Sequence, residues 1–359
     1  MSKWIRHLAV PVAVLALVTA ACSKNKTAAS PASPTPPCTS TLKVGLALDV
    51  GGIGDKSFND AANRGLNKAI ADGLVCQYNT KLIEANATGS NRDDNVQALA
   101  SSGYSLVVGV GFAFSPGVVK IAPQYPYVNF AVIDGYATCG TICGLAAPTP
   151  NIADLDFKEH EGSYLVGIAA AMQAKKDNST TVGFLGGQSG QGLIEKFQAG
   201  YTAGVKSVDP SMKVLVEYIG TDVTAFNDPT KGKALSTKMY GEGADVIYHA
   251  AGGSGSGLFQ AAVEQKKYAI GVDSDQYLTA SAVQQPYILT SMLKRVDVAT
   301  YNAIKKFQKG AQVFGLAEDG LDYSKSNTTL LTPDMIAAMD AAKQKIIAGT
   351  ITVPSVPAV

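Results

Sequence analysis

The sequence predicts an α/β protein made of two lobes, each built around a doubly wound parallel sheet. Strand-like apolar runs alternate with helical patterns along most of the chain, as repeated strand, helix, strand units do. Charged residues make up 16% of the chain and glycines number 36, which is typical of a soluble, loop-rich α/β protein. About 320 residues follow the N-terminal segment, more than one hydrophobic core usually serves. Two lobes are therefore expected.

The strands and helices are expected to alternate from residue 42 onward. Strand-like runs lie at 42–49, 80–85, 105–110, 127–133, 181–186, 212–219, 244–250, 268–273 and 287–292. Helical patterns lie at 58–72, 91–102, 115–123, 158–174, 190–207, 230–241, 256–267, 295–309 and 333–348. Because such units connect by right-handed crossovers, the sheets are expected to be parallel.

The N-terminal segment 1–21 has the pattern of a lipoprotein signal peptide. Lys3 and Arg6 precede an apolar run, 8–21, of about fourteen residues, which is too short to span a membrane and has the length of a secretory core. Small residues before Cys22 resemble a lipoprotein processing box with Cys22 as the lipid attachment site, although Thr19 departs from the commoner aliphatic residue. Ordinary secretion without lipid is the alternative.

Residues 22–40 predict a lipid-anchored tether rich in proline, serine and threonine. The segment has too few apolar side chains to offset the entropy of ordering it, and the prolines between Pro31 and Pro37 add stiffness. The whole chain has 30 basic and 29 acidic residues, so losing Lys3 and Arg6 with the signal peptide leaves a formal charge of −1. A chain with this charge balance is not expected to attract nucleic acid.

The run Val44 to Asn59, VGLALDVGGIGDKSFN, joins an apolar strand to a glycine-rich turn and the start of a helix that Ser57 or Asn59 can cap. Ligands of open α/β sheets bind beyond the carboxyl ends of strands, where this turn would lie. A plain turn with solvated charges is the alternative. The turn resembles a phosphate-binding loop, but Asp55 stands where that loop needs glycine, which disfavours a nucleoside triphosphate.

Four cysteines besides Cys22 form an even set in an exported chain, which favours disulfides. Three pairings are possible. Cys38 and Cys76 each precede one of two adjacent expected strands, and Cys139 with Cys143 would close a small loop, so these two pairs are expected. A zinc site is the alternative, but the spacings lack a C-x-x-C pair.

The passages between the lobes are expected where the alternation is interrupted. The first is placed in 138–156, the second between Asp273 and Leu289, and the third at 312–318. The expected lobe 1 is therefore 41–154 plus 287–312, and the expected lobe 2 is 155–286 plus 313–355.

Carboxylates, aromatic rings, two glycines and one lysine lie at or after the ends of the expected strands. They are Asp49, Phe58, Phe112, Phe114, Asp134, Tyr248, Gly252, Gly253, Asp273, Asp275 and Lys294. Rings can stack on a flat base, carboxylates accept from N–H groups or a ribose diol, and lysine donates to sugar oxygens. Each has a plainer alternative: strand-end aspartates also cap helices, Phe112 and Phe114 also suit the core or crevice wall, and the glycines also permit close backbone approach.

The segment Val44–Asn59 closely resembles the signature of the basic membrane protein family, bacterial lipoproteins that serve as purine-nucleoside-binding subunits of ABC importers. Further segments extend the resemblance in the same order over nearly all of the chain from residue 41. They are VVGVGFAF (107–114), YPYVNFAVID (125–134), VGFLGG (182–187), FQAGYTAGVK (197–206), DPTKGKA (228–234), GADVIYHAAGGSGSG (243–257), YAIGVDSDQ (268–276) and LTSMLKRVD (289–297).

This resemblance implies a type I periplasmic-binding fold with three crossovers and a specific set of ligand contacts. Asp49 and Asp134 would hold the base, Phe58 and Tyr248 would sandwich it, and Gly253, Asp273 and Lys294 would hold the ribose. Tyr248 departs from the phenylalanine of relatives. Asn59 is also expected at the site, although Asn59 and Asp275 could serve the turn instead.

The implied protein is a monomeric, extracytoplasmic lipoprotein that binds a nucleoside and delivers it to an ABC permease, with no cofactor, metal or catalysis. A sugar-binding protein and a surface sensor of the same fold are alternatives. A calcium-dependent nucleoside hydrolase is another, suggested by DSDQ at 273–276, but further carboxylates are lacking nearby. The three histidines form no HExxH motif, and no GxSxG elbow occurs.

Overall fold

A computed structural model describes residues 38–358. The expected signal peptide, Cys22 and most of the expected tether lie outside the described residues and stay predictions. Between Cys38 and Ala358, every helix is too short or too polar to cross a bilayer.

The first lobe is built on a fully parallel six-stranded sheet with the order β11-β5-β4-β3-β1-β2. Its strands are β1 (Val44–Leu48), β2 (Thr80–Glu84), β3 (Leu106–Val110), β4 (Asn129–Ile133), β5 (Ile152–Phe157) and β11 (Gly310–Phe314). The central strands β1 and β3 are buried along their whole length, which explains their continuous apolar runs.

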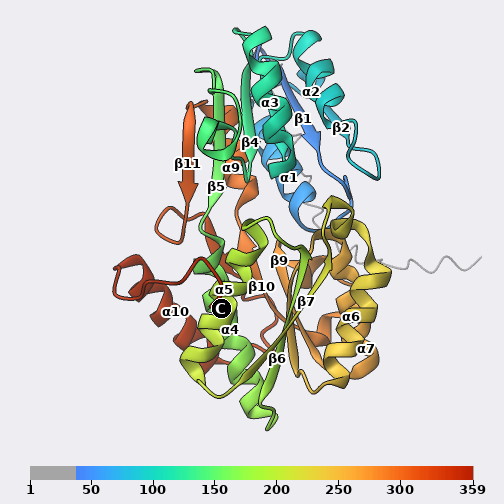
Figure 1. Ribbon diagram of the computed structural model, residues 1–359, viewed down its shortest axis with the longest axis vertical. Helices are drawn as coiled ribbons and strands as arrows, with labels where there is room; N and C mark the ends of the chain where they lie inside the picture. The colour runs from blue at the N-terminus through green and yellow to red at the C-terminus, as the bar shows by residue number, and fades with distance from the viewer. Residues whose placement is uncertain (1–37, 359) are drawn as a thin grey trace, which may run out of the picture. The chain divides into compact units, whose positions relative to one another are not determined.

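The helices of this lobe cover both faces of the sheet (Figure 1). They are α1 (Phe58–Ala71), α2 (Arg92–Ser101), α3 (Ser115–Ile121) and α9 (Val296–Lys305). Helix α1 packs against α9, and α2 against α3. Gly65 of α1 faces the backbone of Asp297 so closely that any side chain there would collide with it. This glycine therefore lets two helices far apart in sequence meet.

The second lobe repeats this strand arrangement in the order β12-β10-β9-β8-β6-β7. Its strands are β6 (Thr181–Gln188), β7 (Lys213–Gly220), β8 (Val246–Ala250), β9 (Tyr268–Asp273), β10 (Ile288–Lys294) and β12 (Leu321–Tyr323). Its helices are α4 (Glu159–Lys176), α5 (Leu193–Val208), α6 (Pro229–Gly241), α7 (Gly255–Gln265), the short α8 (Gln276–Thr279) and α10 (Pro333–Ile347). Strand β12 runs antiparallel to β10, and the other pairs are parallel.

The predicted two-lobed α/β architecture is confirmed, and each expected strand and helix has a counterpart. Strands β5, β11 and β12 were not expected. Each has six residues or fewer. Strands β11 and β12 are edge strands and β5 is next to an edge. Polar residues such as Asp154 and Gln312 interrupt their apolar pattern.

The expected lobe boundaries are wrong at two passages. The first crossing follows β5, so residues 155–157, expected in lobe 2, belong to the first sheet. Strand β10, expected in lobe 1, pairs with β9 and β12 in the second sheet, so that crossing follows Lys294. The third crossing follows β11, within the expected region. An apolar run predicts a strand, but which sheet it joins depends on distant partners.

Hydrogen bonds donated by backbone N–H groups join the three crossings. Lys158 N–H donates to Phe314 C=O at 3.0 Å, and Arg295 N–H donates to Gly320 C=O at 2.9 Å. Leu316 N–H donates to the Glu161 carboxylate at 2.9 Å. The connecting segments therefore form one bonded group between the lobes.

Both expected disulfides are confirmed, Cys38 with Cys76 and Cys139 with Cys143. Both lie in the first lobe. Cys76 stands just before β2, and Cys139 and Cys143 lie in the loop that leads to β5. The second lobe contains no cysteine.

Candidate ligand-binding site

A cavity of about 650 Å³, part of it open to solvent, lies between the lobes. Its walls contain seven of the eight predicted ligand residues, Asp49, Phe58, Asn59, Asp134, Gly253, Asp273 and Lys294. They come from the carboxyl ends of strands in both sheets and from the turns and helix starts that follow those ends.

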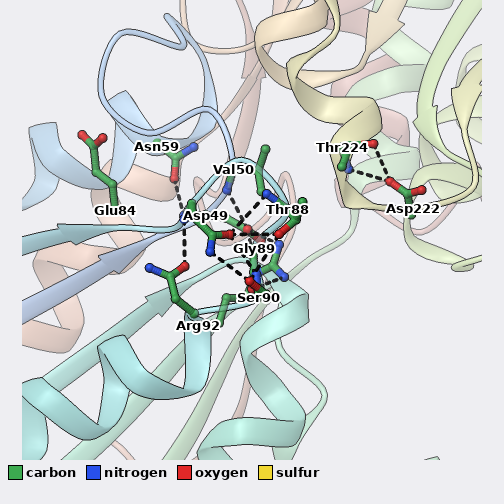
Figure 2. A network of polar contacts seen from close by, with 12 residues as sticks. Asp49, Val50, Asn59, Glu84, Thr88, Gly89, Ser90, Arg92, Asp222 and Thr224 are labelled. Atoms are coloured by element: carbon green, nitrogen blue, oxygen red, sulfur yellow. Dashed lines mark hydrogen bonds and ion pairs between the residues drawn. The ribbon is translucent and has the colours of Figure 1, made fainter.

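Asp49, directly after β1, is held in place by Arg92 of α2 (Figure 2). The Arg92 Nε–H donates to Asp49 Oδ1 at 2.8 Å, and the Val50 N–H donates to the same oxygen at 2.7 Å. Burial raises the pKa of Asp49, while the Arg92 charge opposes that rise. Gly111 leaves room for the other oxygen, since a Cβ there would stand 2.8 Å from Asp49 Oδ2. The carboxylate is thus fixed through Oδ1, and Asp49 lines the cavity.

Asn59 and Asp55 hold the glycine-rich turn together. The Asp49 N–H donates to Asn59 Oδ1 at 3.0 Å, and Asn59 Nδ2 donates to Asp55 Oδ2 at 3.0 Å. Asp55 also accepts from the N–H groups of Ser57 and Asp60 at 2.9 and 3.1 Å. Burial raises the pKa of Asp55 to about 6. Asn59 therefore lies at the cavity but has both polar atoms engaged in the turn.

Asp134 and Asp273 occupy equivalent positions in the two lobes. Asp134 follows β4 and Asp273 ends β9, and these are corresponding strands in the two sheet orders. Both have left-handed backbones, with φ of 56° and 62°. Left-handed residues other than glycine are uncommon and gather at functional sites, so the shared geometry favours a role for both carboxylates.

Lys294, the last residue of β10, is only 2% exposed. Its ammonium donates to Asp134 Oδ2 at 2.6 Å and lies 3.3 Å from Glu159 Oε1. The rings of Phe58, Phe157 and Phe197 surround it, with the ammonium 5.0 to 5.4 Å from their centroids. Burial alone would lower the Lys294 pKa, but the carboxylates of Asp134, Glu159 and Asp273 raise it, so the lysine stays charged.

The carboxylates beside Lys294 retain acceptor capacity. Burial raises the pKa of Asp134, and Lys294 opposes the rise. Asp134 Oδ1 is buried and has no hydrogen-bond partner among the described residues, although its side chain lines the cavity. Such an oxygen can accept from a donor placed in the cavity, which would relieve the cost of a buried, unpaired acceptor.

Asp273 forms part of a set of contacts that join the lobes. The Ser57 hydroxyl of lobe 1 donates to Asp273 Oδ2 at 2.5 Å, and the Ser274 hydroxyl donates back to Ser57 C=O at 2.8 Å. Gln276 Nε2 donates to Lys56 C=O at 3.3 Å. Burial raises the pKa of Asp273 to about 6. We refer to the contacts of Lys56 and Ser57 with Asp273, Ser274 and Gln276 as the latch.

Aromatic rings from both lobes form the apolar part of the cavity. Phe58 and Phe112 come from lobe 1, and Phe197 and Phe226 come from lobe 2. Phe112 and Phe226 meet edge to face across the lobes, with centroids 6.5 Å apart. Phe114, by contrast, is 1% exposed and belongs to the core.

Two of these rings, Phe197 and Phe226, were not predicted as site residues. Phe226 lies in the loop after β7, and Phe197 lies in the first turns of α5 after β6. Phe226 follows the expected strand at 212–219, so its place in the sequence carries the same kind of strand-end signal as Asp134 and Asp273. Phe197 sits within an apolar helical pattern that does not distinguish a cavity residue from a core residue.

The predicted stacking role of Tyr248 is not supported by its position. Tyr248 lies inside β8, is fully buried and does not line the cavity. Its ring packs against Phe184 and Tyr201, and its hydroxyl lies 3.2 Å from that of Ser163 on α4. A residue in the middle of a strand points into the layer beneath the sheet, whereas the cavity is lined from beyond the strand ends.

His249, the next residue, is also fully buried and lies outside the cavity lining. Its Nε2 pairs with Gln276 Oε1 at 2.9 Å. Because that oxygen also accepts from the Val272 N–H, the histidine nitrogen must donate. Burial lowers the His249 pKa to about 4. Its position fits a packing residue.

Comparison with known proteins gives a consistent result. Residues 42–356 match the family described as PnrA-like ABC transporter substrate-binding proteins. The chain is 32% identical over 333 residues to the CD4+ T-cell-stimulating antigen of Listeria monocytogenes, covering 88% of each chain. It is 32% identical over 333 residues to the ABC transporter nucleoside-binding protein BmpA of Lactococcus lactis, covering 88% of this chain and 89% of that one.

Solved structures confirm the predicted fold class. An ABC transporter solute-binding protein from Aeropyrum pernix superimposes with a TM-score of 0.72 and 28% sequence identity, covering 88% of this chain and 93% of that one. Its two-lobed α/β architecture is that of periplasmic-binding proteins, as expected from the sequence.

Proposed function

The chain belongs to the family of PnrA-like ABC transporter substrate-binding proteins, and we propose that it captures a purine nucleoside between its lobes for uptake by an ABC permease. The observation that carries this proposal is the combination in one cavity of aromatic rings from both lobes with buried strand-end carboxylates and one lysine. No catalytic step is part of the proposed function.

The aromatic residues suit a flat heterocycle. Phe58, Phe112, Phe197 and Phe226 give apolar ring surface on both sides of the cavity. Stacking of a base on such a ring is worth about 1–3 kcal/mol. A free sugar lacks this flat surface, so the rings favour a nucleoside over a pentose. Phe226, in place of Tyr248, becomes the proposed lobe 2 partner of Phe58.

The polar residues suit a neutral ligand rich in N–H and O–H donors. Asp49 and Asp134 offer acceptor oxygens to the base, and Asp273 and Lys294 offer an acceptor and a donor to the ribose. Each charge-assisted bond of this kind is worth about 1.5–3 kcal/mol. Carboxylates outnumber cations around the cavity, so a phosphate would meet repulsion. We therefore propose that nucleotides are excluded.

The printed description of the Lactococcus lactis relative as nucleoside-binding supports the same ligand class. The family description supports delivery to an ABC permease on the extracytoplasmic side of the membrane. Lipid attachment at Cys22 is part of the proposal and is tested by mass spectrometry of the mature N-terminus. A Cys22→Ala variant provides the control, since it should leave the membrane fraction.

Calorimetry of the folded part tests the ligand class. The protein from Cys38 to Val359, which retains the Cys38–Cys76 disulfide, is titrated with inosine, guanosine, adenosine, cytidine, ribose and inosine monophosphate. Purine nucleosides should bind, with ribose and the nucleotide weaker by at least about tenfold. Absence of binding to every nucleoside would contradict the proposal, and release of free base in a parallel assay would indicate a hydrolase instead.

A further inference from the structure

Glu159, the first residue of α4, lies against the site without lining the cavity. Its side chain has 0% exposure, and neither carboxylate oxygen has a hydrogen-bond partner among the described residues. Two ammonium groups lie at ion-pair distance, Lys294 at 3.3 Å and Lys196 at 3.5 Å. A fully buried carboxylate without hydrogen bonds is costly and depends on neighbouring charge.

We propose that Glu159 is the positioning residue for Lys294: it holds the ammonium within lobe 2, so that Asp273 stays available to the ligand. This inference rests on the proposed function, because it assigns Glu159 a part in presenting the nucleoside site. Glu159 itself does not contact the ligand.

The distribution of the charges between the lobes supports this assignment. Lys294 ends β10 and Glu159 begins α4, and both elements belong to lobe 2 and pack on one another. The other close partner of Lys294, Asp134, belongs to lobe 1. When the lobes separate, Asp134 moves away with lobe 1, whereas Glu159 stays beside the lysine. Glu159 is thus the partner that keeps the ammonium in place before the ligand arrives.

Without the Glu159 charge, the lysine would turn to the remaining carboxylate of its own lobe. Asp273 lies close enough to Lys294 for each to shift the pKa of the other. An ammonium paired to Asp273 would occupy the carboxylate proposed to accept from the ribose. Binding would then require breaking an ion pair inside lobe 2, which lowers the affinity and slows association.

Several charged groups from other elements face this cluster. They are Asp134 after β4, Asp156 of β5, Lys196 of α5, Asp273 of β9 and Lys294 of β10. The negative charge of Glu159 raises the pKa of Asp134 and of Asp273, whereas the positive charge of Lys196 lowers the pKa of Asp134. Removing Glu159 or Lys196 should therefore shift the pH dependence of binding in opposite directions.

The test compares the wild-type protein from Cys38 to Val359 with Glu159→Gln, using inosine as the probe from pH 5 to 9. Wild-type affinity should fall on the acid side as Asp134 and Asp273 take up protons. Glu159→Gln should weaken binding at pH 7.5 by about tenfold, slow association, and move the acid-side midpoint to lower pH. Glu264→Gln, the same change at an exposed ion pair of α7, should alter neither affinity nor midpoint.

Lys196→Met supplies the second variant, because Lys196 is partly exposed and its loss should not prevent folding. Its acid-side midpoint should move to higher pH. This variant also decides the question if Glu159→Gln does not fold.

The outcomes separate the two proposals. If the wild-type protein binds inosine but Glu159→Gln binds it with the same affinity and midpoint, the positioning role is overturned and the nucleoside site stands. An unchanged midpoint in Lys196→Met counts equally against the positioning role. If the wild-type protein binds no nucleoside, the proposed function itself fails.

Discussion

The two lobes share one strand order but contribute different chemistry to the cavity. Lobe 1 supplies most of the polar groups, Asp49, Asp55, Asn59 and Asp134, several of them fixed by Arg92 or by backbone N–H donors. Lobe 2 supplies an apolar surface, Leu193, Ile194, Phe197, Phe226 and Val272, with Asp273 and Lys294 as its charged groups. The lobe 1 side also carries the rings of Phe58 and Phe112. We call the lobe 1 side the polar wall, because most of the polar groups lie there, and the lobe 2 side the apolar wall.

The equivalent aspartates show the difference most directly. Asp134 of lobe 1 accepts from Lys294 of lobe 2, and Asp273 of lobe 2 accepts from Ser57 of lobe 1. Each carboxylate is therefore bonded across the cleft, one to a cation and one to a hydroxyl. The two side chains that are proposed to bind the ligand are therefore also the ones that join the lobes.

The largest effect on affinity is expected for a substitution in the polar wall. Asp49→Asn should weaken inosine binding by about 10- to 100-fold, because a charge-assisted hydrogen bond of about 1.5–3 kcal/mol is lost. Calorimetry measures the change. Asp94→Asn, the same substitution at an exposed position of α2, is the control and should bind normally. Equal affinities for all three proteins would remove Asp49 from the ligand contacts.

A comparable effect is expected from the apolar wall. Phe226→Ala should weaken nucleosides by about tenfold, since stacking on one ring is worth about 1–3 kcal/mol, and should leave free ribose unchanged. Phe226→Tyr keeps the flat face and should retain most of the affinity. A uniform loss for nucleoside and ribose would show that Phe226 acts on lobe closure and not on the base.

A smaller effect is expected from pH, with opposite signs for stability and binding. Burial raises the pKa of Asp273 and Asp55 to about 6 and that of Asp156 to about 8, above the unfolded value near 3.9. Groups of this kind stabilise the folded state at low pH and lose that contribution as pH rises through the folded pKa. Burial lowers the pKa of His249 to about 4, so His249 has the opposite effect on stability, and that effect is confined to pH values below about 6.5.

The free protein should therefore show a melting temperature that falls between pH 6 and 8.5, while its affinity for inosine rises toward neutral pH. Thermal denaturation and calorimetry in the same buffers measure the two trends. A melting temperature that rises across this interval would contradict the assigned shifts.

The smallest effect is expected for Tyr248→Phe. The hydroxyl of Tyr248 contacts Ser163 inside lobe 2 and does not reach the cavity. Removing it should leave nucleoside affinity within about twofold and lower the stability modestly, by the roughly 1 kcal/mol of a buried hydrogen bond. A large loss of affinity with normal stability would restore the original assignment of Tyr248 to the site.

The contrast between the walls also explains which residues of the site the sequence could predict. The lobe 1 turn is one continuous segment, so Asp49, Phe58 and Asn59 could be recognised together. Asp134 and Asp273 follow apolar strands directly, which made them predictable. The lobe 2 wall is assembled from the start of α5 and the loop after β7, and no local pattern brings Phe197 and Phe226 together.

The lobe boundaries were limited by a related problem. The sequence predicts that β10 is a strand, but only its pairing with β9 and β12 places it in lobe 2. Strand β11 lies at an edge with alternating burial, and its neighbour β5 lies more than 150 residues earlier. Pairing over such distances is decided by packing of the whole lobe. Arg92 was likewise invisible, because only the fold brings α2 to Asp49.

The latch has a consequence for how the protein could adapt to its environment. Ser57, Lys56, Ser274 and Gln276 bond the lobes together through groups of the protein itself. A site that is competent for only a fraction of the time binds more weakly by that fraction. Substitutions of Ser57, Ser274 or Gln276 would therefore tune how scarce a ligand the protein can capture, while the residues proposed to recognise that ligand, Asp273 among them, stay unchanged.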